Sequence, residues 1–144
     1  MSESLHYRNL ERMYHGHPLN AYYEAKLNVS KGKAELVIPI KKSFWHAAQA
    51  VHGSVYFKAL DDAAYFSANS VVWDVFLLTV SFTIYLMRPV SVGELRAVGR
   101  LVNSARTQFI AEATLYNSEN QELARGSGLY VRSKIKLTEE LGYR

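Results

Sequence analysis

Two adjacent carboxylates, Asp61 and Asp62, interrupt a stretch of small and apolar residues that runs from 54 to 72. The apolar positions fall on nearly every side of the helix that this stretch predicts, which is typical of a helix buried on most sides. Aspartate is a poor helix former and is costly to bury without a partner. A carboxylate in such surroundings has its pKa raised toward the range of a general base, so the pair is a candidate for acid–base chemistry.

Neighbouring positions of a helix differ by about 100° around its axis, so Asp61 and Asp62 are expected to have different roles. One carboxylate would face a pocket while the other faces solvent or a partner. The structural alternative is that one or both only reach solvent or cap a neighbouring loop.

A second polar feature, His52-Gly53-Ser54, stands directly before this helix. We expect Ser54 to be the N-cap and Gly53 to let a ligand approach the backbone closely. Free N–H groups at a helix N-terminus can hold an anion or polarise a carbonyl group. The structural alternative is an ordinary helix start, in which His52 only anchors the loop through a hydrogen bond.

The spacing of the two features limits how they can cooperate. Gly53 and Asp61 are eight residues apart, which corresponds to roughly 12 Å of helix rise. One carbonyl carbon cannot touch both groups of one chain, so a joint site needs Gly53 of one subunit and Asp61 of another. A two-fold axis would create two such sites and cover the exposed apolar side of the helix. We therefore expect a homodimer, or a dimer of such dimers.

The elements expected around the helix form an α+β arrangement within one domain, residues 1–144. A helical extension is expected at residues 1–16 and a frayed tail at 138–144. The expected strands are a hairpin of 22–29 and 33–40, followed after the helix by 75–87, 93–104, 106–117 and 122–137. A single helix would therefore pack against an antiparallel sheet.

Composition excludes several classes of protein. Apolar residues make up 49% and charged residues 21%, a globular balance, and the absence of cysteine removes disulfides, thiolate metal sites and cysteine nucleophiles. No stretch approaches the roughly 20 apolar residues of a membrane span, and the N-terminus lacks the apolar run of a signal peptide. We expect a soluble, cytoplasmic protein with no membrane partner.

The polar residues also argue against other functions. The net charge of +4 suits an anionic small ligand, and a nucleic-acid role lacks both a recognition motif and a basic stripe. His15 and His17 are a close pair without a carboxylate cluster, so no metal site is expected. A Ser-His-Asp hydrolase lacks its Gly-x-Ser-x-Gly turn.

A family resemblance is carried by residues 52–70, HGSVYFKALDDAAYFSANS. This stretch resembles the His-Gly-Gly…Asp signature of hotdog-fold thioesterases of the phenylacetic-acid-degradation (PaaI-like) type, in which the aspartate falls nine residues after the histidine, on Asp61. The likeness continues through 79–107 and covers roughly 17–134. It implies a hotdog fold, one long central helix wrapped by an antiparallel sheet of about five to six strands.

The resemblance also implies an activity, hydrolysis of an acyl-CoA thioester to free acid and CoA without a cofactor. The Gly53 N–H would polarise the thioester carbonyl, and His52 would orient that loop and the acyl group. Asp61 of the partner subunit would act as general base on water or as nucleophile. Thr79, which aligns with a Ser or Thr of the family's following strand, would help to place the water.

Two positions depart from the family pattern. Ser54 replaces the second glycine, and His46 replaces an asparagine six residues before His52. Both would lie beside the thioester and are candidate substrate contacts. His46 could act as a donor in place of the asparagine, or add an acid–base group near neutral pH.

Further substrate contacts are expected from aromatic and basic residues near the helix. Tyr65 and Phe82 are the expected acyl-pocket residues, with Asp62 beside them, and Arg88 is expected at the rim, where the phosphates of CoA need positive charge. Three further aromatic residues could line the pocket or belong to the core: Tyr56, Phe57 and Phe66. Three further basic residues are candidates for the rim: Lys58, Arg106 and Arg125.

Two other functions stay open. A hotdog hydratase or dehydratase, acting on acyl-CoA or an acyl carrier, also uses a histidine and a carboxylate, but in a different motif order. Ser54 and His46 leave room for a hotdog protein that binds acyl-CoA without catalysis. The glycine before the helix and the aspartate on it favour hydrolysis.

Overall fold

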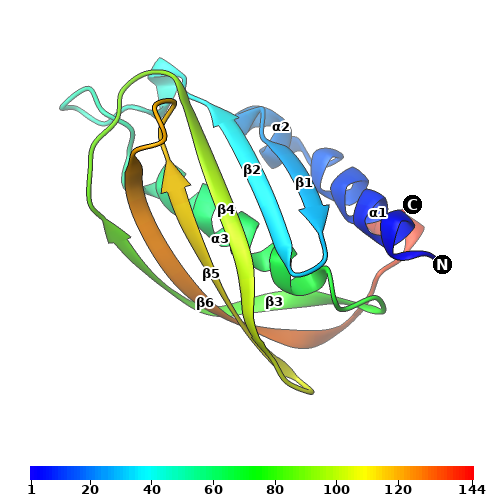
Figure 1. Ribbon diagram of the computed structural model, residues 1–144. Helices are drawn as coiled ribbons and strands as arrows, with labels where there is room; N and C mark the ends of the chain where they lie inside the picture. Colours follow the sequence, from blue (N-terminus) through cyan, green and yellow to red (C-terminus); the bar gives the residue numbers. More distant parts are fainter.

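The computed structural model describes residues 1–144, with one long helix held against a curved antiparallel sheet (Figure 1). The helices and strands are α1 (Glu3–His15), α2 (Pro18–Tyr23), β1 (Lys26–Ser30), β2 (Lys33–Pro39), α3 (Gly53–Asn69), β3 (Val75–Leu86), β4 (Glu94–Ser104), β5 (Gln108–Tyr116) and β6 (Glu122–Lys136). The strand order is β1-β2-β4-β5-β6-β3 and all neighbours are antiparallel. The predicted α+β architecture is confirmed. None of the helices combines the length and apolarity that a bilayer crossing requires.

Helix α3 starts on a histidine cap. The His52 side chain accepts a hydrogen bond from the Ser54 N–H through Nδ1, at 3.0 Å. The N-cap is therefore His52, and the prediction of Ser54 was wrong, because the imidazole takes the acceptor role that a short polar side chain usually has. The helix ends at Asn69 rather than 72, since the Asn69 amide donates to the Val72 carbonyl at 3.0 Å.

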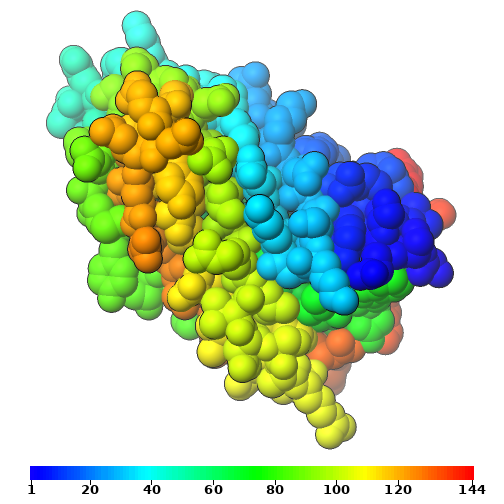
Figure 2. Space-filling model, in the orientation of Figure 1, coloured from blue at the N-terminus to red at the C-terminus, as the bar shows by residue number.

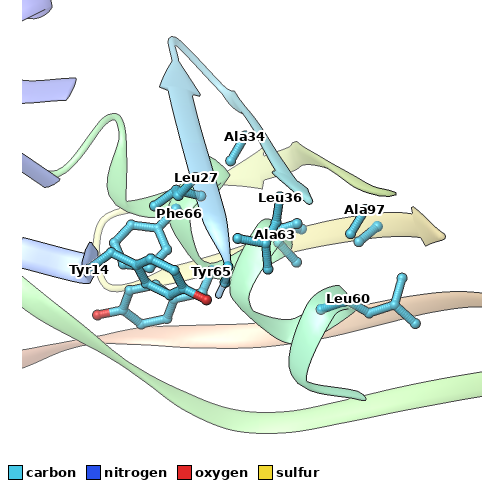
Figure 3. Close-up of a cluster of buried hydrophobic side chains, with 14 of the residues drawn as sticks. Tyr14, Leu27, Ala34, Leu36, Leu60, Ala63, Tyr65, Phe66 and Ala97 are labelled. Atoms are coloured by element: carbon cyan, nitrogen blue, oxygen red, sulfur yellow. The ribbon is translucent and has the colours of Figure 1, made fainter. Parts of the chain in front are cut away.

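Small residues let α3 approach the sheet closely. Ala63 of α3 and Ala97 of β4 are fully buried and lie in the same cluster of side chains (Figure 3). A Cβ built on Gly99 of β4 would lie 2.1 Å from the Ala63 carbonyl oxygen. Gly99 is therefore required by the distance between helix and sheet, and that distance sets where the polar side chains of α3 lie relative to the strands.

The segment before β1 differs from the prediction. A strand was expected from Tyr22, but residues 18–23 form helix α2 and β1 begins only at Lys26. Pro18 suits the first turn of a helix, because its fixed φ matches the helix and its missing N–H needs no acceptor there. Glu24 then ends α2 in the left-handed region, at φ 53°.

The tail at 138–144 is packed rather than frayed. Tyr143 is buried and its hydroxyl lies 2.6 Å from His6 Nδ1, while His6 Nε2 lies 3.0 Å from the Asn69 carbonyl oxygen. The carbonyl can only accept, so Nε2 carries the proton and Tyr143 donates to Nδ1. Burial lowers the pKa of His6, which favours this neutral form. The clasp ties the tail to α1 and the end of α3, and both termini lie close together (Figure 1).

We predict that Gly99→Ala lowers the free energy of unfolding by about 1–3 kcal/mol, because the added methyl forces α3 away from β4. Chemical denaturation measures this change. Gly16→Ala is the matched control, since its nearest atom would be 3.3 Å away, in place of 2.1 Å, and its φ of −77° suits any residue. Equal losses in the two variants would contradict the close approach at Gly99.

Candidate active site

Asp61 lies halfway along α3, with its carboxylate facing β3 and β6. Tyr130 of β6 donates to Asp61 Oδ1 at 3.0 Å, and Thr79 of β3 donates to the same oxygen at 3.3 Å. Tyr130 is fully buried. Because both donors reach Oδ1, the carboxylate is held in one orientation and Oδ2 keeps its lone pairs for another partner.

The surroundings of Asp61 make it an unusually basic carboxylate. Burial raises the pKa of Asp61 from 3.8 to about 6, the hydrogen bond from Tyr130 opposes this rise, and the neighbouring charge of Asp62 adds to it. Such a group is ionised at neutral pH and still accepts a proton readily, as a general base must. Burial and the Asp61 charge in turn raise the pKa of Tyr130, which keeps it a donor.

Asp62 faces the same side of the molecule but is paired. Its Oδ2 accepts from the Tyr14 hydroxyl at 2.6 Å and lies 2.8 Å from Lys58 Nζ. Lys58 also donates to the Asn20 side chain at 2.5 Å. The two carboxylates thus differ in their partners, since one has a free oxygen and the other belongs to an ion pair. Both line the same cavity, however, so the expectation that they would face different surroundings was wrong.

A cavity of about 420 Å³ opens beside the two carboxylates, between α3, β3 and the N-terminal helices. Tyr65 lines it together with Phe66, and their rings gather with that of Tyr14 (Figure 3). Phe82 does not line this cavity. It lies further along β3 and packs edge-on against Phe57, with ring centroids 5.5 Å apart.

A second hollow, of about 340 Å³, lies at the start of α3. Gly53, His46 and Arg88 line it, and no residue lines both this hollow and the cavity at Asp61. The Gly53 N–H has no acceptor in the chain. Gly53 and Asp61 therefore lie in separate hollows of one chain, as the helix spacing indicated.

The remaining predicted contacts are placed as follows. Ser54 Oγ is 2.8 Å from the capping His52 nitrogen, and His46 Nδ1 accepts from the Ala48 N–H at 3.1 Å. Of the basic candidates, Arg88 alone lines the hollow at Gly53. Lys58 is paired with Asp62 and Arg125 with Glu122, while Arg106 lies exposed between β4 and β5.

Nothing in the chain is arranged as a metal centre. No group of three or more His, Asp or Glu side chains converges on one point. His15, half of the close histidine pair, already accepts from the Leu27 N–H through Nε2, at 3.0 Å.

Strand β3 is an uncovered edge of the sheet. From its fourth residue on, the strand and the residue that follows it expose large apolar side chains: Leu78, Val80, Tyr85, Leu86 and Met87. The end of the strand (green) lies uncovered at the left margin of the molecule in Figure 2. An apolar edge strand with unpaired backbone groups is a surface that pairs readily with another strand.

The sequence patterns did not predict two features of this site, the contact of Tyr130 with Asp61 and the packing of α1 beside the cavity. A signal for Tyr130 existed: alternation places it on the inward face of β6 with Ala124, Gly126 and Gly128, and a phenol on a buried face needs a partner. No local pattern places Met13 or Tyr14 beside α3, because that contact joins segments about fifty residues apart.

Comparison with solved structures gives the fold a class. The PaaI protein of the Escherichia coli phenylacetic acid degradation operon superposes with a TM-score of 0.86, at 18% identity, over 94% of this chain and 99% of that one. A thioesterase family protein of Silicibacter pomeroyi gives 0.81, at 21% identity, over 90% and 97%. The predicted hotdog fold, here with six strands, is confirmed.

The family follows from the sequence match. Residues 48–124, more than half of the chain, match the family model of the thioesterase superfamily, so the chain belongs to this superfamily. A relative in Thermoplasma volcanium, named as a candidate esterase (TV1331), is 22% identical over 71% of this chain and 77% of that protein. Membership supports thioester hydrolysis as the class of activity.

We predict opposite stability effects for the two carboxylates. Because the folded pKa of Asp61, about 6, lies above its ordinary 3.8, the ionised form costs stability above pH 6 and this cost vanishes below about pH 4. Asp61→Asn should therefore raise the free energy of unfolding at pH 8 by about 1–3 kcal/mol and change it little at pH 4.

Asp62→Asn is the matched control on the adjacent residue. It leaves Lys58 without its 2.8 Å partner, so it should lower stability at pH 8 by about 1–3 kcal/mol. Thermal and urea unfolding at both pH values measure the two effects. A loss of stability in Asp61→Asn at pH 8 would contradict the raised pKa of Asp61.

Proposed function

We propose that the protein hydrolyses an acyl-CoA thioester to the free acid and CoA. The observation that carries this proposal is Asp61, a partly buried carboxylate held through one oxygen by Tyr130 and Thr79 and free at the other. Its pKa of about 6 suits a base that works near neutral pH. Membership of the thioesterase superfamily supports the reaction class.

In the proposed reaction Asp61 Oδ2 takes a proton from a water molecule, and the water oxygen forms a bond to the carbonyl carbon. The negative charge that develops on the carbonyl oxygen is stabilised by the Gly53 N–H, which has no acceptor within the chain. The C–S bond then breaks, and the proton held by Asp61 passes to the CoA sulfur. His52 keeps Gly53 in place by capping α3.

The complete site is proposed to form between two copies of the chain. Gly53 and Asp61 line separate hollows, and strand β3, which contacts α3, is an edge of the sheet with exposed apolar side chains. Pairing of two β3 edges around a two-fold axis would set the start of one α3 beside the middle of the other. Arg88 and His46, beside Gly53, would then face the CoA half of the substrate.

Mixed dimers test this shared site. Asp61→Asn removes the base, and Gly53→Pro removes the N–H while Pro suits the first position of a helix. Each variant alone should lose about a hundredfold or more in kcat/KM. Mixing them should restore up to about a quarter of wild-type activity, because half of the dimers then carry one intact site.

The control mixture is Asp61→Asn with Asp61→Ala, in which every site lacks the base, and it should stay inactive. Absence of recovery in verified mixed dimers would contradict the shared site. The wild-type protein is also tested on short, long and aryl acyl-CoAs. Binding without hydrolysis of any of them would contradict catalysis and support a protein that only binds acyl-CoA.

Tyr130 is predicted to set the pH range of the reaction. It donates to the ionised form of Asp61 and so lowers the pKa of that carboxyl. Tyr130→Phe should therefore move the acid limb of the kcat/KM profile to higher pH. Thr79→Val, which removes the longer 3.3 Å bond, should move it less in the same direction. An unmoved limb in a folded Tyr130→Phe protein would contradict this role.

A further inference from the structure

The cavity beside Asp61 ends on a residue of the N-terminal helix. Met13 of α1 is 2% exposed and lines this cavity of about 420 Å³. Met13 also lines another hollow, of about 460 Å³, which lies between α1 and the C-terminal tail. His17 is the other residue that the two spaces share. A wall about one side chain thick therefore separates them.

The two spaces differ in chemistry. The lining of the cavity at Asp61 includes the rings of Tyr14, Phe66 and Phe76. The hollow behind the wall is polar and carries charged residues from α1 and the tail: Arg12, Glu139, Glu140 and Arg144. An apolar group that enters beside Asp61 thus finds apolar contacts only as far as Met13.

The depth of the apolar space follows from the helix. Tyr65 and Phe66 come four and five residues after Asp61, so they lie about 6–8 Å further along α3. The Tyr14 ring packs against Phe66 with centroids 5.3 Å apart, and its hydroxyl reaches Asp62 at 2.6 Å. Helix α1 therefore closes the cavity between one and two turns beyond the proposed base.

The wall is held from behind by the tail. A Cβ on Gly142, whose φ is +88°, would lie 3.3 Å from Met13 Cα, so the tail packs directly on α1 at this residue. The clasp of Tyr143, His6 and Asn69 fixes the tail in turn. Met13 consequently has little freedom to move aside for a longer ligand.

We propose that Met13 is the end wall of the acyl pocket and sets the length of the acyl group that the protein accepts. Compact aryl and medium-chain acyl groups fit between Asp61 and this wall, and longer straight chains collide with the Met13 side chain. The proposal rests on the proposed function, since it takes the thioester carbon to lie at Asp61. The wall comes from residues outside the segment that matches the thioesterase superfamily, 48–124.

The test compares kcat/KM for hexanoyl-, octanoyl-, decanoyl- and dodecanoyl-CoA. Met13→Ala removes most of the side chain with which longer chains collide, so the ratio of dodecanoyl to hexanoyl turnover should rise by about tenfold or more. Met13→Leu, which keeps the volume, should retain the wild-type ratio. Met13→Val replaces Met13→Ala should the latter fail to fold, with a smaller rise in the ratio.

Leu10→Ala is the matched control. Leu10 is fully buried on the same helix and lines neither space, so its truncation should lower the melting temperature without changing the chain-length ratio. An unchanged ratio in folded Met13→Ala, or an equal change in Leu10→Ala, would overturn the proposal.

A binding measurement distinguishes failure of this proposal from failure of the proposed function. Calorimetry with non-hydrolysable hexyl and dodecyl thioethers of CoA measures the same preference without catalysis. Should the wild type hydrolyse nothing, the proposed function fails, and the wall still predicts that Met13→Ala improves dodecyl over hexyl binding by about tenfold. An equal preference for dodecyl over hexyl thioether in the wild type and in Met13→Ala would overturn the role of Met13 as end wall, whatever the catalytic result.

Discussion

The burial of one carboxylate within a packed helix is the constraint on which the rest of the structure depends. Asp61 is close enough to the sheet to lose much of its water, and it stays ionisable because Tyr130 and Thr79 replace part of that water. This balance needs α3 to lie close to the strands, which the missing side chain of Gly99 permits. The same closeness gives Asp61 a pKa of about 6.

The stiffness of α3 keeps two chemically useful groups apart, one at the start of the helix and one at its middle. A free N–H at Gly53 and a free carboxylate oxygen at Asp61 are complementary groups for acyl transfer, yet one straight helix holds them apart. The apolar edge of β3 offers the surface through which a second copy would bring them together. Under the proposed function, the pairing that covers the edge would also complete the site, so catalysis would depend on assembly.

The N-terminal helix and the tail add a layer that the core of the fold does not need. Tyr14 reaches the ion pair of Asp62 and Lys58, and Met13 closes the space beside it. The tail holds α1 in place, because the Tyr143 hydroxyl bonds the buried His6 of that helix. Under the proposed function, a helix packed over the end of the pocket would change the accepted acyl group while Asp61 and Gly53 stay as they are.

Local patterns in the chain were sufficient for the helix and five of the six strands, because periodicity is a short-range signal. Motif spacing, which is also a local signal, singled out Asp61 as the candidate base. They misplaced the start of β1, where Pro18 opens a helix, and the cap of α3, where an imidazole acts as acceptor. The contact of Tyr130 with Asp61, the place of Met13 and the packed tail were decided only by tertiary structure. Each of these contacts joins residues far apart in the chain, and their meeting depends on the path of the whole sheet around α3.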